Sequence, residues 1–344
     1  MPRRPATLRR LWRWLDRKLP TFSPAVMRRG AEVALAALTF IVFTGAAVRL
    51  TGSGLGCPDW PKCYGGVAPP LETHAWIEFG NRLISGLVGL VAFGAAFMAW
   101  RRRPFRRDLW RLSVLLPLGV LAQAVLGGFT VIYHLAPGFV MGHYALAMLM
   151  LAAAVALVWR ARYGPGERPR SLDRVAVWAV RALLALGALT IFLGTVATAA
   201  GPHAGGAGTG DEIDRLEWKG LETLDWAIKQ HGRIATVLGI AVVAVYLLLR
   251  RRGAPEDVKR PVAITAALLA VQGAVGGIQY LLEVPAEIVW VHVVLAALTW
   301  IALLWATAAA GRPAPGSMAL PAASEEAAEA PAADVGAVLG APGA

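Results

Sequence analysis

Eight long apolar runs constrain the fold of this chain more than any other feature. Each run has about 20 residues, enough for a helix to cross the hydrocarbon core of a bilayer. Because lipid offers the backbone no hydrogen-bond partners, such runs form helices rather than open strands. The sequence predicts an all-α integral membrane protein with spans near 31–50, 76–99, 112–132, 138–159, 175–199, 226–249, 261–282 and 287–310.

The basic residues are distributed as membrane topology requires. Of the 34 Lys and Arg residues, 27 lie before the first span, after the last one, or around 101–111, 160–181 and 250–260. If the eight spans alternate, these positions share one side, and the positive-inside rule makes that side the cytoplasm. The net charge of +12 therefore indicates a lipid bilayer as the partner of this chain, and we expect no nucleic-acid binding.

An internal repeat divides the spans into two sets of four. Residues 123–128 (QAVLGG) recur as residues 272–277 (QGAVGG), and His143 and His292 keep the same separation of 149 residues. Both copies begin on the cytoplasmic side, so the repeat is parallel. We expect two pseudo-symmetric four-helix bundles.

The repeat and the composition together predict five segments. They are a basic cytoplasmic N-terminal segment (1–30), an N-terminal four-helix bundle (31–160), a cytoplasmic linker (161–174), a C-terminal four-helix bundle (175–310) and a cytoplasmic tail (311–344). The tail consists mainly of Ala, Pro, Gly and Glu and buries too little apolar surface to fold, so we expect it to be disordered.

The C-terminal half carries a pair of histidines that suits a haem. His231 and His292 each lie about five residues inside a span, at the same depth near the outer membrane face, on helices that can face each other. Ionisable side chains inside a membrane are costly and usually functional. Two facing imidazoles are the axial ligands of a six-coordinate haem, whereas zinc takes more protein ligands. The alternative is two separate histidines that bond to neighbouring groups.

The N-terminal half keeps only one of the two histidines. His143 matches His292, but Asn81 stands where the second half has His231, after a slip of one residue in the repeat. An iron bound by His143 alone would keep an open position for chemistry, and Asn81 can hydrogen-bond a ligand or substrate. Glu78 lies one helical turn from Asn81 and is a candidate acid, base or proton relay; alternatively, it is a solvated residue or pairs with Arg82.

Further polar residues lie near the same outer face. Arginine forks suit carboxylates, so Arg49, Arg82 and Arg233 are candidates to hold haem propionates, unless they reach lipid headgroups. His203 lies in an outer loop and is expected to line the second site, or else to be solvated. His74 and His134 are expected to be solvated loop residues, although His74 can also reach the first site.

Mid-membrane glutamines and glycines are expected to serve helix packing. Gln123 and Gln272 occupy matched positions and are expected to form interhelical hydrogen bonds rather than to take part in catalysis. Glycines near the histidines allow helices, or a flat macrocycle, to approach closely; they include Gly45, Gly127, Gly194 and Gly276.

Cys57 and Cys63 are the only two cysteines, and both fall in the first outer loop. Outside the cytoplasm, two such close thiols can form a disulfide. The bridge would either be redox-active or set the geometry beside a site, or simply staple the loop. A metal site built from two thiols alone is not expected.

Several segments resemble the haem A synthase family. The resemblance is carried by RLTGSGLGCPDWPKCYG at 49–65, EFGNR at 78–82, LGGFTV at 126–131 and GPHAG at 201–205, and it runs from about residue 31 to 310. It implies a bacterial plasma-membrane enzyme with eight helices that oxidises the C8 methyl of haem O to a formyl group, making haem A for cytochrome c oxidase. Implied partners are haem O, a haem O synthase, the oxidase assembly machinery and an electron donor that the sequence does not identify.

The resemblance also implies roles for individual residues. The family holds a haem b in its C-terminal half through histidines that match His231 and His292. In the N-terminal half, where the substrate haem is placed, a histidine matches His143 and a glutamate matches Glu78. The cysteines that match Cys57 and Cys63 form a disulfide in bacterial members.

The chain departs from the family pattern at Asn81. Many members have a second N-terminal histidine there, so the resemblance does not extend to two-histidine ligation of the substrate haem. Two other classes of function stay open on the residues alone: a b-type cytochrome that only transfers electrons, and a haem-binding assembly factor or transporter without catalysis. The asymmetry of the two halves favours the enzyme, because an electron carrier would be expected to keep both histidine pairs.

Overall fold

The computed structural model of the protein describes residues 18–164 and 173–312. The expectations for most of the basic N-terminal segment, for the centre of the linker and for nearly all of the tail therefore lie outside the described residues.

Eight helices, each long and apolar enough to cross a membrane, make up most of the described chain. This confirms the prediction of an all-α, eight-span membrane protein. One short strand, β1 (Trp218–Leu221), precedes the sixth of these helices. The helices are α2 (Pro24–Leu50), α3 (Thr73–Arg101), α4 (Arg107–Ile132), α5 (Pro137–Arg162), α6 (Arg174–Ala200), α7 (Thr223–Arg251), α8 (Glu256–Leu281) and α9 (Ala286–Ala310).

Capping residues and prolines set several helix starts. The Ser23 side chain accepts a hydrogen bond from the Val26 amide, and Pro24 occupies the first turn of α2. At α6, the Asp173 carboxylate accepts hydrogen bonds from the amides of Val175 and Ala176. Such side chains satisfy amide donors that the first turn of a helix leaves unpaired.

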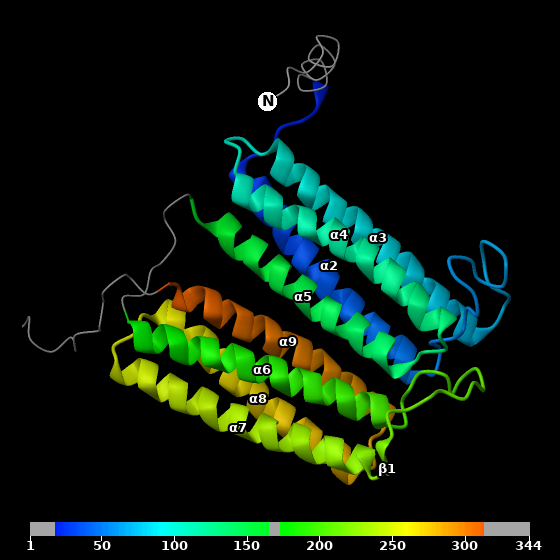
Figure 1. Ribbon diagram of the computed structural model, residues 1–344. Coiled ribbons are helices and arrows are strands. Elements are labelled where there is room, and N and C mark those ends of the chain that lie inside the picture. Colours follow the sequence, from blue (N-terminus) through cyan, green and yellow to red (C-terminus); the bar gives the residue numbers. More distant parts are fainter. Residues whose placement is uncertain (1–17, 165–172, 313–344) are drawn as a thin grey trace, which may run out of the picture.

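The helices pack as two rings of four. In the first ring each of α2 to α5 contacts the next, and α2 closes the ring on α5; α6 to α9 form the second ring in the same way. Figure 1 shows the two groups side by side. They meet where α9 packs against α2 and α5, and the indole nitrogens of Trp290 and Trp300 donate hydrogen bonds across this seam to the carbonyls of Phe43 and Met148, each at 3.0 Å.

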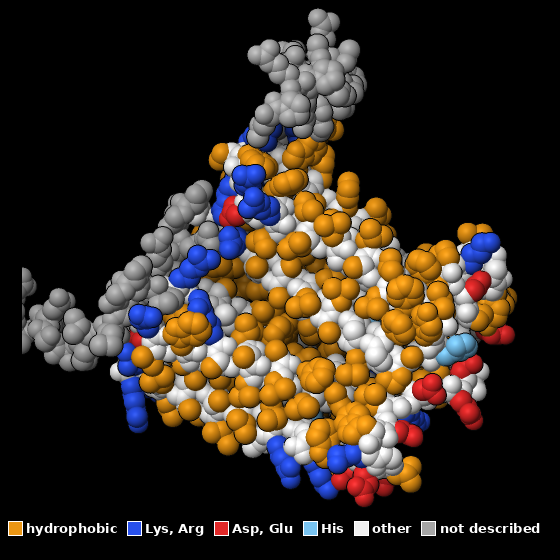
Figure 2. All heavy atoms as spheres, viewed as in Figure 1, with side chains coloured by type: hydrophobic (Ala, Val, Ile, Leu, Met, Phe, Trp, Pro, Cys, Tyr) orange, Lys and Arg blue, Asp and Glu red, His pale blue; other side chains and the backbone are white. Residues whose placement is uncertain are grey.

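The outer surface of the helices is apolar, as a bilayer requires. Leu87, Leu90 and Phe93 on α3 and Leu121 on α4 are among the large apolar side chains that point outward. In Figure 2 apolar side chains cover most of the face between the two ends, whereas most of the acidic side chains gather at the end that carries the long loops. Burying such a surface in lipid removes it from water.

Two long loops meet at one end of the molecule. We call it the disulfide end; it comprises the first loop (residues 51–72), the second loop (residues 201–222) and the turns at 133–136 and 282–285. The Gly54 amide donates to the Gly205 carbonyl, and the Gly208 amide to the Gly52 carbonyl, at 2.8 and 3.1 Å. The opposite end, which we call the arginine-rich end, includes residues 102–106, 163–164, 173 and 252–255.

Candidate functional site

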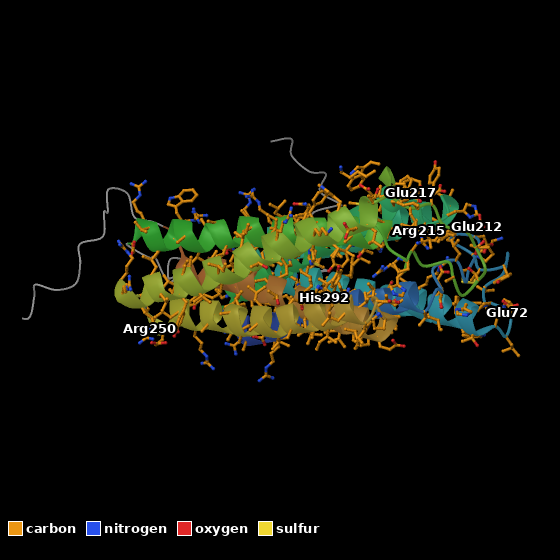
Figure 3. The ribbon with its side chains drawn as sticks, turned by 90° about the horizontal axis from the view of Figure 1, so that it is seen from below. Glu72, Glu212, Arg215, Glu217, Arg250 and His292 are labelled. Carbon is orange, nitrogen blue, oxygen red and sulfur yellow. A yellow bond between two sulfur atoms is a disulfide. The ribbon has the colours of Figure 1, made fainter. Side chains whose placement is uncertain are left out.

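The structure brings His231 and His292 together inside the C-terminal ring. His231 lies on α7 and His292 on α9, the two helices that face each other across α6 and α8. Their ring centroids are 6.1 Å apart. In Figure 3 His292 lies along the helices between Arg250 at one end and Glu72, Glu212 and Glu217 at the other.

Each of the two rings keeps a nitrogen available for a ligand in the described structure. Nδ1 of His231 lies 3.0 Å from the Thr190 carbonyl. Since a carbonyl only accepts, Nδ1 carries the proton and Nε2 keeps its lone pair, the arrangement that fixes histidine ligands of metals. Nδ1 of His292 is buried and has no hydrogen-bond partner in the described structure.

Glycines bring the neighbouring backbones close to these rings. A Cβ added at Gly194 on α6 would lie 3.1 Å from Cε1 of His231, and one added at Gly276 on α8 would lie 3.2 Å from Cε1 of His292. Both separations are tighter than ordinary packing. A side chain at either glycine would therefore push on the ring that it faces.

The pair suits the axial positions of a haem. An imidazole nitrogen binds a first-row metal at about 2 Å, so two rings on opposite sides of one metal have centroids roughly 6 Å apart. Among the described residues, no group of three His, Cys, Asp or Glu side chains is placed to hold a metal ion. Two histidines are a known ligand pair for a haem, whose macrocycle supplies the other four donors.

The N-terminal ring repeats half of this arrangement. His143 on α5 packs against Gly127 on α4, where an added Cβ would lie 3.3 Å from Cε1, and its Nδ1 is also buried without a partner. Asn81 on α3 accepts a hydrogen bond through Oδ1 from the Thr44 hydroxyl on α2, at 2.8 Å. Thr44 was not found by sequence reasoning, although it directly precedes the repeat-matched Gly45.

A matched glutamine holds the helix backbone at each of these histidines. Nε2 of Gln123 donates to the His143 carbonyl, and Nε2 of Gln272 donates to the His292 carbonyl, both at 3.0 Å. The expectation of interhelical hydrogen bonds from the two glutamines is confirmed. These bonds set the depth of each histidine helix relative to the helix before it.

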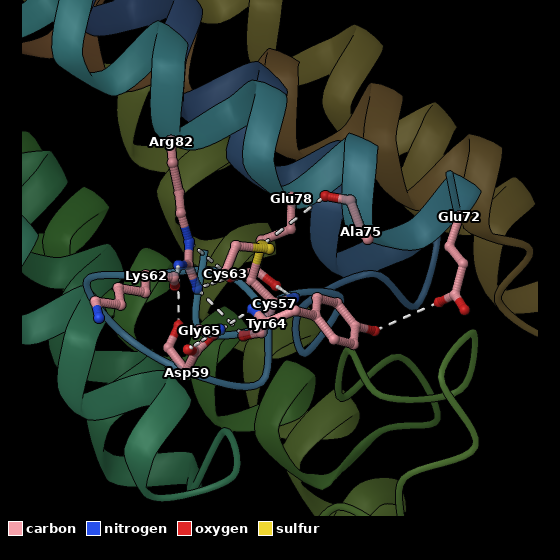
Figure 4. Close-up of a disulfide and its surroundings, with 10 residues drawn as sticks. All are labelled: Cys57, Asp59, Lys62, Cys63, Tyr64, Gly65, Glu72, Ala75, Glu78 and Arg82. Carbon is pink, nitrogen blue, oxygen red and sulfur yellow. Dashed lines mark hydrogen bonds and ion pairs between the residues drawn. A yellow bond between two sulfur atoms is a disulfide. The ribbon is translucent and has the colours of Figure 1, made fainter. Parts of the chain in front are cut away.

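Glu78 and Arg82 join α3 to the first loop. Glu78 is 6% exposed; its Oε2 accepts from the Cys57 amide at 2.7 Å, and its Oε1 accepts from Nη2 of Arg82 at 2.6 Å and from Nε at 3.1 Å. Arg82 also donates to the carbonyls of Asp59, Lys62 and Cys57. Figure 4 shows these bonds around the loop. The pairing of Glu78 with Arg82, considered above as an alternative to a catalytic role, is present, and Glu78 is not a solvated surface residue.

Cys57 and Cys63 form a disulfide inside this loop. The loop folds back over α4, because Trp60 covers Gly128, where an added Cβ would lie 2.9 Å from the indole. Asp59 accepts hydrogen bonds from the amides of Tyr64 and Gly65, both at 2.7 Å. The contact between Trp60 and Gly128 was not predicted from the sequence. Its only signal there is the position of Trp60 between the two cysteines.

The remaining candidates lie in different surroundings. Nη1 of Arg49 donates to the His203 carbonyl at 2.7 Å, and Nε2 of His203 bonds to the Val284 carbonyl at 2.7 Å. His203 thus joins the second loop to the turn before α9. Arg233 is exposed on α7. Arg82 makes five hydrogen bonds within the protein, which equals the number of its N–H groups, so it would have to release one of them to hold a propionate.

The two weaker histidine candidates differ from each other. His134 is exposed in the turn before α5, as expected of a solvated residue. His74 is half-buried: its Nδ1 lies 2.8 Å from the Ser53 hydroxyl, and a Cβ added at Gly208 would lie 2.2 Å from its ring. The expectation that His74 is solvated was wrong, because the first and second loops close on its ring.

Comparisons with known proteins identify the family that the chain resembles. The model of the COX15-CtaA family, described as cytochrome oxidase assembly protein, matches residues 30–304. A protein of Rhizorhabdus wittichii named heme A synthase is 31% identical over 328 residues, covering 79% of this chain and 90% of that protein.

Shorter matches concern proteins of the same name. The heme A synthases of Bacillus licheniformis and Alkalihalophilus pseudofirmus are 30% and 34% identical over 122 and 121 residues. These matches cover 35% and 34% of this chain, and the chain spans 40% of the length of each of these two relatives.

Proposed function

Because the chain belongs to the COX15-CtaA family of cytochrome oxidase assembly proteins, we propose that it is a haem A synthase that oxidises the C8 methyl of haem O to a formyl group. The observation that supports this best is the facing pair of His231 and His292, with ring centroids 6.1 Å apart. Its glycine-lined surroundings suit a flat macrocycle, and its neighbouring bundle carries a related but different site.

The C-terminal bundle is proposed to hold haem b through His231 and His292. Held there by both histidines, haem b would supply electron transfer. The chain contributes the fixed orientation of the rings: the Thr190 carbonyl holds Nδ1 of His231, and Gln272 holds the backbone at His292.

The N-terminal bundle is proposed to take the substrate haem. His143 is its axial ligand, with Asn81 at the position that His231 occupies in the other bundle. Glu78 is held by Arg82 and by the Cys57 amide, so its carboxylate has a defined position at the mouth of the bundle. There it would accept and pass on protons released as the methyl group is oxidised.

Arg49, Arg233 and His203 are proposed to lie near the haem propionates. Arg49 and His203 are already joined at the disulfide end, where a haem bound at the depth of the histidines would present its charged edge. A guanidinium matches a carboxylate in charge and geometry. Arg82 is a weaker candidate for this role, because its N–H groups hold the first loop.

We place the protein in a bacterial cell membrane with its disulfide end facing away from the cytoplasm. The arginines of the opposite end support this orientation through the positive-inside rule. The disulfide between Cys57 and Cys63 supports it as well, because disulfides persist outside the cytoplasm. A haem O synthase would supply the substrate, and the assembly machinery of cytochrome c oxidase would receive the product. A separate electron carrier would exchange electrons with the haem of the C-terminal bundle.

Co-expression with a haem O synthase in a host that lacks haem A tests the proposed function. Haems are extracted with acid from the purified protein and separated by chromatography. We expect haem A, or its hydroxylated intermediate. Haem b alone, with haem O demonstrably present in the cells, would contradict the synthase and favour a b-type cytochrome.

A further inference from the structure

The two bundles differ in what lies beside one pair of matched glycines. Gly194 on α6 faces the ring of His231, and a Cβ added there would lie 3.1 Å from it. Gly45 on α2 is the repeat-related position, 149 residues earlier in the chain. A Cβ added at Gly45 would meet nothing within 4 Å.

Asn81 stands in the N-terminal bundle at the position that His231 occupies in the C-terminal bundle. An asparagine side chain is shorter than a histidine and carries no ring. The Thr44 hydroxyl also holds Oδ1 of Asn81 at 2.8 Å, so the amide is tied to α2 one residue before Gly45. The place that an imidazole fills in the C-terminal bundle is thus left open in the N-terminal bundle.

The other half of the N-terminal site is intact. His143, like His292, has a glycine close to its ring and a glutamine bonded to its carbonyl. A Cβ added at Gly127 would lie 3.3 Å from its Cε1, and Nε2 of Gln123 donates to its carbonyl at 3.0 Å. The chain therefore keeps the support for one axial ligand and lacks the second. If the N-terminal site had lost its function, we would expect these contacts to be lost as well.

We propose that the N-terminal bundle is a one-histidine haem site whose Asn81 side takes a small, neutral, exchangeable ligand about the size of an imidazole. The inference rests on the proposed function, since it requires a haem bound by His143. The chemical class is a compact molecule with a lone pair for iron, because Gly45 leaves open space and Asn81 offers a neutral amide.

The test uses imidazole as the probe and the spin state of ferric haem as the readout. The full chain is purified after co-expression with a haem O synthase, and optical and electron paramagnetic resonance spectra are recorded during an imidazole titration. We expect a high-spin haem that becomes low-spin with imidazole, alongside a low-spin haem that does not respond. His143→Ala should remove the responsive signal, which assigns it to the N-terminal bundle.

Two substitutions decide whether the gap is the binding position. Asn81→His should convert the N-terminal haem to low-spin without imidazole and abolish the response. Gly45→Leu should fill the gap and weaken imidazole binding by about tenfold or more, because the leucine side chain and the imidazole would compete for the same space. Its matched control, Gly194→Leu, should instead disturb the unresponsive haem, since it pushes on His231.

A wild-type protein whose haem is entirely low-spin and unresponsive to imidazole would overturn the inference. So would an imidazole response that is unchanged in both Asn81→His and Gly45→Leu. Conversion of haem O is measured in the same preparations. If haem O is converted but no haem responds to imidazole, the proposed function stands and the inferred ligand position is wrong. If a haem responds but haem O is not converted, the ligand position stands and the proposed function is wrong.

Discussion

The two four-helix bundles support their histidines in the same way but complete the sites differently. Gln123 and Gln272 donate to the carbonyls of His143 and His292 at the same distance of 3.0 Å, and a glycine lies against each of these rings. Only the C-terminal bundle adds a second facing ring. A resident cofactor benefits from two protein ligands, whereas a substrate that must leave benefits from one.

The bundles also differ in how a loop covers them. The first loop carries the disulfide and is held to α3 through Glu78 and Arg82. The second loop is attached to its surroundings through His203 and through backbone bonds to the first loop. The first loop is therefore tied to α3 by a disulfide-containing segment and a buried carboxylate, and the proposed role of Glu78 in proton transfer rests on this difference.

Removal of a facing histidine should have the largest effect and should separate the two bundles. We expect His231→Ala or His292→Ala to lose the haem of the C-terminal bundle, because one protein ligand is lost from a site built on two. His143→Ala is the matched control and should retain that haem. Haem content and optical spectra of the purified proteins measure this; full retention of a six-coordinate haem in both His231→Ala and His292→Ala would contradict the assignment.

Glu78→Gln should leave the C-terminal haem in place and slow conversion of haem O by about 100-fold or more, the usual contribution of an acid or base. The measurement is the yield of haem A over time by chromatography. Glu72→Gln is the control, because Glu72 is exposed and the one side-chain hydrogen bond described for it comes from the Tyr64 hydroxyl, at 3.4 Å. An unchanged rate in Glu78→Gln would remove its catalytic role.

Loss of the disulfide should affect one bundle only. Replacing both Cys57 and Cys63 by alanine should destabilise the protein by about 2 kcal/mol, as expected for a bridge that closes a short loop. Thermal unfolding in detergent measures this change. The spectrum of the C-terminal haem in the native state should stay unchanged. Loss of that spectrum in the variant would show that the disulfide supports both bundles rather than one.

The matched glutamines should behave alike. Gln123→Leu and Gln272→Leu each remove one interhelical hydrogen bond, worth about 0.5–1 kcal/mol inside a membrane protein. We expect similar shifts in the thermal unfolding midpoint for both variants and near-additive shifts in the double variant, because the two sites share no partner. A large difference between the single variants would show that the two glutamine hydrogen bonds are not equivalent in energy.

The smallest expected effect is a pH dependence at the arginine-rich end of the C-terminal bundle. Burial opposes ionisation of Asp173, but the hydrogen bonds from Arg252 and from the amides of Ala176 and Val175 outweigh it, so its pKa lies below the ordinary value. A lowered pKa in the folded state stabilises the protein above the ordinary pKa of aspartate, and this stability is lost as the pH falls through the lowered value.

We expect the Asp173 contribution to be below about 1 kcal/mol, because the pair with Arg252 is partly exposed. Unfolding midpoints measured between about pH 6 and pH 2.5, across the ordinary aspartate pKa near 3.9, should fall less steeply in Asp173→Asn than in the wild type. Identical slopes in the two proteins would contradict the assignment.

Much of the candidate site could be predicted from the sequence, because its residues carry chemistry in their side chains. His143, His231 and His292 stand out by type, depth and repeat spacing, and the cysteines by their place in one loop. Thr190 could not be found in this way, since it acts through its backbone carbonyl. His74 was misjudged because its surroundings come from two loops that are distant in sequence.

The sequence by itself determined the number of spans, their order and the matched positions of the histidines, because apolar length and repeat spacing are properties of the chain residue by residue. Only the tertiary structure decided that Arg82 holds the first loop, that Arg49 reaches a carbonyl 154 residues away, and that open space lies beside Gly45. These features depend on which segments come into contact when the helices pack, and a linear pattern does not specify those contacts.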